Sequence, residues 1–178
     1  MASPTSAAAD RIGVVIRVPE PRAERLRTVR RQAGDPLAAL EPHLTLVTGV
    51  QVGDWAAALE HVRSVAAATA PFNLLVQGAG TFRPVTPVVY AAVVEGVDEC
   101  MQLHVALQSG PLEASSEYPY VPHVTLAQHV DDAALDAAAL SHSLERWWLF
   151  ADSLSVYAAP ADATPEEWEL LETVALGG

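Results

Sequence analysis

The pattern of apolar and polar positions predicts alternating strands and helices in the first half of the chain. A β-branched run over 11–18 is typical of a buried strand. The segment 21–34 opens with proline and closes with glycine, which predicts a helix between them. A strand over 42–47 follows, then a helix capped by Asp54 and a strand over 72–78.

The same order of elements repeats in the second half. The expected elements are a strand over 86–94, a helix over 97–110, a strand over 122–127, a helix that begins after Asp131, and a strand over 149–159. In the last of these helices, the apolar positions at helical spacing include Leu140, Leu144 and Trp147. A final edge strand is expected over 168–176.

The repeated order predicts two related halves inside one domain. A chain of 178 residues is the length of a single domain, and each half alone would be small for a stable core. We therefore expect one domain over 11–178, made of pseudo-symmetric halves at about 11–78 and 86–159 plus the C-terminal strand. The Ala- and Ser-rich segment 1–10 is expected to be disordered.

Each half contains the motif Pro-His-x-Thr-Leu in a predicted strand, first at 42–46 and again 80 residues later. Side chains two residues apart in a strand share a face. His43 and Thr45 therefore point the same way, as do His123 and Thr125. If a pseudo-twofold axis relates the halves, both pairs converge on one cleft.

Two histidines in one cleft suit acid–base chemistry on a phosphorus centre. Imidazole has a pKa near neutrality, so one ring can activate water while the other protonates a leaving oxygen. Threonine hydroxyls can bind the non-bridging oxygens, where charge develops. The sequence leaves the order of the two roles open, and we assign His43 as the acid and His123 as the base. The plain alternative is that both histidines are satisfied at strand ends and that threonine is there for its β-propensity.

The charge balance restricts the ligand. Ten basic and 22 acidic residues give a net charge of −12, which argues against binding long duplex nucleic acid but leaves room for a small anion. Seven arginines fall within residues 1–31, where they either face a phosphate or form a solvated helix face. One cysteine and no export or membrane signal predict a cytoplasmic protein. Each motif supplies a single histidine, so no metal site and no cofactor are expected.

At these residues the sequence resembles the 2H phosphoesterase superfamily, the group of 2′-5′ RNA ligase-like proteins and RNA 2′,3′-cyclic phosphodiesterases. The resemblance covers nearly the whole chain. It implies an α+β fold, bilobal and duplicated, with two antiparallel-rich sheets around a central groove and helices outside. It also implies His43 and His123 as the acid–base pair and Thr45 and Thr125 as phosphate ligands.

One position departs from the family pattern. RNA-acting members often have a basic residue shortly after the second motif, where this chain has Gln128. Without that charge, mononucleotide cyclic phosphates, ADP-ribose cyclic phosphate and cyclic oligonucleotides become comparable candidates to polymeric RNA. Tyr120 precedes the second motif and either stacks on a base at the groove rim or packs within its own loop.

These observations predict a monomeric, metal-independent phosphodiesterase that hydrolyses a 2′,3′-cyclic phosphate or a related small nucleotide phosphodiester. An RNA terminus is a second candidate substrate. The alternatives are a nucleotide- or RNA-end-binding module with little turnover, and a 2′-5′ RNA ligase.

Overall fold

The computed structural model describes residues 9–177. In chain order the elements are β1 (Arg11–Arg17), α1 (Arg22–Ala33), β2 (His43–Gln51), α2 (Trp55–Ala67), β3 (Phe72–Thr81), β4 (Val88–Glu95), α3 (Val97–Leu107), η1 (Gly110–Leu112), β5 (His123–Gln128), α4 (Asp132–His142), β6 (Arg146–Ala151), β7 (Ser153–Ala159), η2 (Pro165–Glu167) and β8 (Glu169–Ala175). Segment 1–8, most of the predicted unstructured N-terminus, lies outside the described residues.

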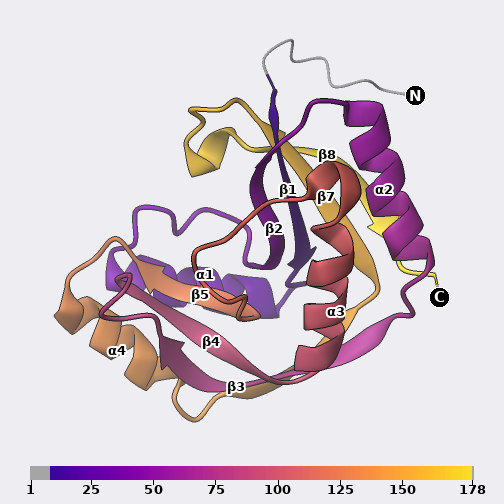
Figure 1. Ribbon diagram of the computed structural model, residues 1–178. Coiled ribbons are helices and arrows are strands. Elements are labelled where there is room, and N and C mark those ends of the chain that lie inside the picture. Colours follow the sequence, from indigo (N-terminus) through magenta and orange to yellow (C-terminus); the bar gives the residue numbers. More distant parts are fainter. Residues whose placement is uncertain (1–8, 178) are drawn as a thin grey trace.

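The predicted α+β class is confirmed, with four α-helices around a curled antiparallel sheet (Figure 1). The eight strands follow the order β6-β3-β4-β5-β2-β1-β7-β8. The two expected sheets are the two four-stranded halves of this sheet, and they meet where β2 pairs with β5 at Leu44 and Val124. Helix α1 packs against α4, and α2 packs against α3 (Figure 1).

Each half of the sheet takes strands from both halves of the sequence. We name β2, β1, β7 and β8 the first lobe, and β5, β4, β3 and β6 the second lobe. Strand β3 crosses into the second lobe and pairs with β4 and β6, whereas β7 returns to pair with β1. This exchange leaves β2 and β5, which bear the two motifs, as the innermost strands.

The single strand expected over 149–159 is wrong. Strand β6 ends at Ala151 and β7 begins at Ser153, so Asp152 separates two strands that lie in different lobes. Phe72 of β3 pairs with Ala151, and β7 pairs with β1. An uninterrupted strand cannot satisfy both partners, so the chain turns between them.

The buried face expected for the last helix is also wrong. Helix α4 ends at His142, and Trp147 is buried in β6. Leu140 and Leu144 are 76% and 96% exposed, while Leu135 is fully buried. The caps behave as predicted, because the Asp131 side chain accepts a hydrogen bond from the Ala134 amide at the helix start.

No helix within residues 9–177 is both long enough and apolar enough to cross a membrane.

Candidate active site

The two motif strands bury one face and leave the other half-buried. Leu44 and Leu46 of β2, and Val124 and Leu126 of β5, are at most 1% exposed and belong to the core. The alternate positions share the opposite face of each strand: His43, Thr45, His123 and Thr125. Strand periodicity thus places all four predicted residues on the side away from the core.

The register between the strands brings the two motifs together. Leu44 pairs with Val124 in the antiparallel order. In an antiparallel pair, the residue before one partner lies opposite the residue after the other. His43 therefore lies opposite Thr125, and Thr45 lies opposite His123. The two histidines occupy diagonal corners of a four-residue group. The two rings also interact electrostatically, since the charge of His123 is one of the causes that lower the pKa of His43.

Both histidines are oriented by the same backbone contact. Nδ1 of His43 lies 2.7 Å from the carbonyl oxygen of Glu41, and Nδ1 of His123 lies 2.7 Å from that of Val121. Because a carbonyl can only accept, each Nδ1 carries the proton and donates it. Nε2 of each ring is then the nitrogen that can take up or release a proton.

The surroundings of both rings favour the neutral imidazole. Burial is the main cause that lowers the pKa of His43 and of His123, and the backbone hydrogen bonds oppose it only in part. The positive charge of Arg30 lowers the pKa of His43 further. Incoming phosphate brings negative charge, which shifts an imidazole back toward its protonated form.

A cavity of about 550 Å³ opens beside this group. His43, Thr45 and Thr125 line it, and Gln128 does too. Its far wall belongs to the first lobe and includes Trp168, whose ring lies against β1. A Cβ on Gly13 of β1 would lie 3.0 Å from Trp168 Cζ3, so glycine makes this close approach possible.

His123 does not line this cavity and is packed by aromatic rings instead. The centroid of its ring lies 4.9 Å from that of Phe82 in an edge-on arrangement, and 5.3 Å from that of Tyr90. Phe82 stands in the turn between β3 and β4. Phe82 and Tyr90, both from the second lobe, therefore pack against the ring of His123.

Tyr120 lies behind β2 and is not one of the cavity-lining residues. Its hydroxyl donates to the Thr45 carbonyl oxygen at 3.0 Å, and its ring stacks on His104 at a centroid distance of 4.0 Å. Burial raises the pKa of the Tyr120 hydroxyl, which stays protonated as a donor. Tyr120 thus supports the strand on which Thr45 stands.

The sequence analysis did not single out Arg30, which also lines the cavity. Its side chain is buried, and its Nε lies 2.9 Å from Asp35 Oδ2. The two oxygens of Asp35 also accept from the amides of Leu37 and Gln128, at 2.8 and 3.3 Å. A signal was present, since Arg30 follows the buried Leu26 by four residues and so shares its helix face.

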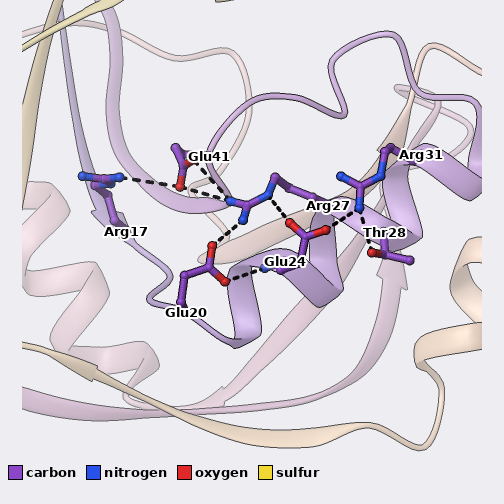
Figure 2. Close-up of polar contacts among 7 residues, drawn as sticks. All are labelled: Arg17, Glu20, Glu24, Arg27, Thr28, Arg31 and Glu41. Carbon is purple, nitrogen blue, oxygen red and sulfur yellow. Dashed lines mark hydrogen bonds and ion pairs between the residues drawn. The ribbon is translucent and has the colours of Figure 1, made fainter.

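Other arginines near the N-terminus form ion pairs at the surface (Figure 2). Arg27 stands at the centre, with Nε 2.9 Å from Glu24 and Nη1 3.2 Å from Glu41. Arg31 shares Glu24, and Arg17 shares Glu41 at 3.5 Å. Arg27 and Arg31 stand on helix α1 and Arg17 ends strand β1, and acidic side chains already pair with the charge of each.

Three further histidines have structural partners. His61 donates to backbone carbonyls of α3, and Nδ1 of His104 donates to the Leu46 carbonyl at 2.7 Å. Nε2 of the buried His142 accepts from Trp147 Nε1 at 3.3 Å. Within residues 9–177 no three His, Cys, Asp or Glu side chains are grouped so that they could hold a metal ion.

Sequence comparison connects this chain to a family of known proteins. The model of the 2′-5′ RNA ligase superfamily matches residues 18–174. A Bacillus licheniformis protein named as a candidate phosphoesterase is 35% identical over 123 residues, which are 67% of this chain and 72% of that protein. A Bacillus cytotoxicus protein of the same description is 27% identical over 169 residues, 94% of this chain and 97% of that protein.

Solved structures share the fold. Escherichia coli LigT in complex with 3′-AMP superposes with a TM-score of 0.68 at 23% identity, covering 94% of this chain and 98% of LigT. A Thermus thermophilus protein superposes with a TM-score of 0.67 at 21% identity, covering 94% of this chain and 98% of that one.

Proposed function

Since this chain belongs to the 2′-5′ RNA ligase superfamily of 2H phosphoesterases, we propose that it hydrolyses a small nucleotide phosphodiester, with a 2′,3′-cyclic phosphate as its preferred class. In this proposal His43 and His123 are the acid–base pair, and Thr45 and Thr125 bind the phosphate. The enzyme needs no metal or cofactor and acts as a cytoplasmic monomer.

The observation that carries this proposal is the matched setting of the two histidines. Each donates from Nδ1 to the carbonyl oxygen two residues earlier, at 2.7 Å, on adjacent innermost strands. A histidine with a purely structural role needs one hydrogen-bond partner, and it does not need a second histidine in a matching position. Two imidazoles with the same tautomer and a shared face are what in-line transfer at phosphorus requires, one for each side of the reaction.

In the proposed reaction, one neutral imidazole takes a proton from water as the water oxygen bonds to phosphorus. The bond from phosphorus to a ribose oxygen breaks, and the other imidazole, protonated, gives its proton to that oxygen. The product is a ribose phosphomonoester. The hydroxyls of Thr45 and Thr125 donate to the non-bridging oxygens as their charge grows.

The charge near His43 bears on the order of roles. Arg30 is a cation that lowers the pKa of His43, and no such cation is among the causes at His123. A base must be neutral before it accepts a proton, so we propose His43 as the base and His123 as the acid. This order is the reverse of the one assigned from the sequence.

The size of the cavity and the net charge of the chain support a small substrate. A cavity of about 550 Å³ suits a nucleotide. LigT has been solved with 3′-AMP, with phosphate, with ATP and with NADP⁺. With a net charge of −12, long duplex nucleic acid is disfavoured, and a single RNA terminus is the larger substrate that we consider. In this proposal Gln128, which lines the cavity, contacts the bound substrate.

The test is hydrolysis of 2′,3′-cyclic nucleotides in the presence of EDTA by wild type, His43→Asn and His123→Asn. Asparagine keeps a donor for the i−2 carbonyl and deletes Nε2, so folding is preserved better than with alanine. We expect each variant to lose about 10²-fold or more in kcat/KM, the range for a general acid or base. Full activity in either variant would overturn the proposal.

Two other outcomes identify the alternatives. Wild type could instead bind 3′-AMP tightly and form no product from 2′,3′-cyclic nucleotides after long incubation. That result would show a nucleotide-binding module. Formation of a 2′-5′ linkage between RNA ends would show a ligase, and the same histidine variants would abolish it.

A further inference from the structure

Arg30 is a charged side chain in the wall of the cavity that is not fully partnered. It is 2% exposed, and it is the only arginine that lines the cavity in the described chain. Its Nε is taken by Asp35, but its Nη2 is buried without any hydrogen-bond partner. Buried polar atoms are nearly always paired, and leaving a charged donor unpaired is costly. The fold therefore holds a cationic donor ready for an acceptor that is not part of the chain.

The surroundings of Arg30 are built to keep it in place. Asp35 is itself buried, and backbone amides of Leu37 and Gln128 hold both of its oxygens. Gln128 ends β5, so this contact ties α1 and its following loop to the second motif strand. Such a fixed guanidinium loses little conformational entropy when it binds an anion.

Arg30 lies at the end of the site where His43 stands. Strands β2 and β5 are antiparallel around Leu44 and Val124, so Gln128, beyond Thr125, falls at the His43 end of β2. Arg30 and His43 line the same cavity, and the charge of Arg30 is among the causes that lower the pKa of His43. A phosphate held by Thr125 next to His43 would lie within the reach of Arg30.

The acidic groups at the cavity leave the Nη2 donor of Arg30 without a partner. Asp35 occupies only the Nε edge of the guanidinium. Glu41 lines the cavity, but its carboxylate pairs with Arg27 and Arg17 (Figure 2). Glu166 also lines the cavity and belongs to η2, in the segment that carries the far wall.

We propose that the guanidinium of Arg30 is the cationic ligand of the substrate phosphate, and that it supplies from α1 the positive charge that Gln128 does not supply from β5. It binds an oxygen of the phosphate group on the His43 side, in addition to the threonine hydroxyls. This inference rests on the proposed site for phosphate but does not require that the site turn substrate over.

The experiment is a calorimetric titration of inorganic phosphate into wild type, Arg30→Met and Arg25→Gln, at neutral pH and constant ionic strength. Arg25 is exposed on the same helix, so its variant is a matched control for loss of one positive charge. Hydrogen bonds to charged groups are the strong class, so we expect Arg30→Met to weaken phosphate binding by about tenfold or more. Arg25→Gln should stay within about twofold of wild type.

Removing Arg30 leaves Asp35 as an unpaired buried charge, and the single variant could fail to fold. The double variant Arg30→Met/Asp35→Asn removes both charges and should show the same loss of phosphate affinity in a folded protein. In wild type, the NMR signal of the Arg30 side-chain Nε–H should shift on phosphate addition while that of Arg25 does not.

This inference would be overturned by unchanged phosphate affinity in the folded Arg30 variants. It would also be overturned if the NMR signal of the Arg30 Nε–H did not shift when phosphate is added. The outcome is separable from that of the proposed function. Phosphate binding that depends on Arg30, without hydrolysis of any cyclic phosphate, would support the role of Arg30 and contradict the proposed hydrolase function. Hydrolysis by wild type with phosphate affinity independent of Arg30 would do the reverse.

Discussion

Leu44 and Val124 form the register pair that joins β2 to β5, and with them the two lobes of the sheet. Both side chains are fully buried, and the residues on either side of each belong to the His-Thr group. The same pair therefore serves the core on one face and sets the positions of His43 and His123 on the other. Packing beneath the sheet and chemistry above it are linked at this point.

This link predicts that Leu44→Ala lowers stability and activity together. Deleting the buried side chain should reduce the free energy of unfolding by about 2–5 kcal/mol, because a cavity replaces its packing. Leu170→Ala is the control, since Leu170 is 46% exposed on β8 and should change stability by less than about 1 kcal/mol. Urea unfolding measures the free energy of unfolding of both variants. A Leu44 variant as stable as the Leu170 variant would contradict the packing argument.

Replacing either threonine of the motifs should slow turnover without unfolding the protein. Thr45→Val and Thr125→Val keep the β-branched shape and delete the hydroxyl that meets the phosphate oxygens. We expect kcat/KM to fall by about 10²-fold or more in each, the scale for one oxyanion-stabilising donor. Thr173→Val, at an exposed position on β8, should leave kcat/KM unchanged. Intact kinetics with a shifted Tm would mean that the threonines are scaffold.

The histidines should make stability depend on pH. Burial lowers the pKa of His43 and of His123 below 6.5 in the folded protein. Between the folded pKa and 6.5 the unfolded chain binds more protons, so this stability is fully present above pH 6.5 and is lost as pH falls.

The measurement is urea unfolding at about pH 7.5 and about pH 5.5 for wild type and the His43→Asn/His123→Asn double variant. The double variant should lose less stability between the two pH values. His142 also has a pKa lowered by burial, but it is present in both proteins and cancels in the comparison. Equal losses would show that the two motif histidines are not the source of the pH dependence.

Tyr120→Phe should weaken the fold slightly and leave substrate binding intact. The change deletes the hydroxyl that donates to the Thr45 carbonyl at 3.0 Å, at a cost of about 1 kcal/mol. The ring still stacks on His104, so β2 keeps its place. We expect a lower Tm by differential scanning fluorimetry with KM unchanged. Should the Phe variant keep its Tm and bind substrate poorly, Tyr120 would have to face the substrate after all.

Local features of the chain were open to prediction because they depend on neighbouring residues alone. Asp54 and Asp131 cap helices, and Gly34 closes α1 in the left-handed conformation, as expected from residue type. The two-residue period of a strand placed His43 and Thr45 on one face before any tertiary contact was known. The sequence by itself therefore determined the helices and strands apart from the break at Asp152, the pairing of histidine with threonine, and the family.

Only the tertiary structure decided which strands meet and which charges are buried. The sequence around Asp152 predicts one strand. The chain turns there because β6 and β7 pair with strands in different lobes. Arg30 and Arg31 are adjacent and chemically identical, yet one enters the cavity wall and the other pairs with Glu24 at the surface. The reason is physical: burial of a side chain depends on residues distant in sequence, such as Asp35 and Gln128 around Arg30, and no local pattern records them.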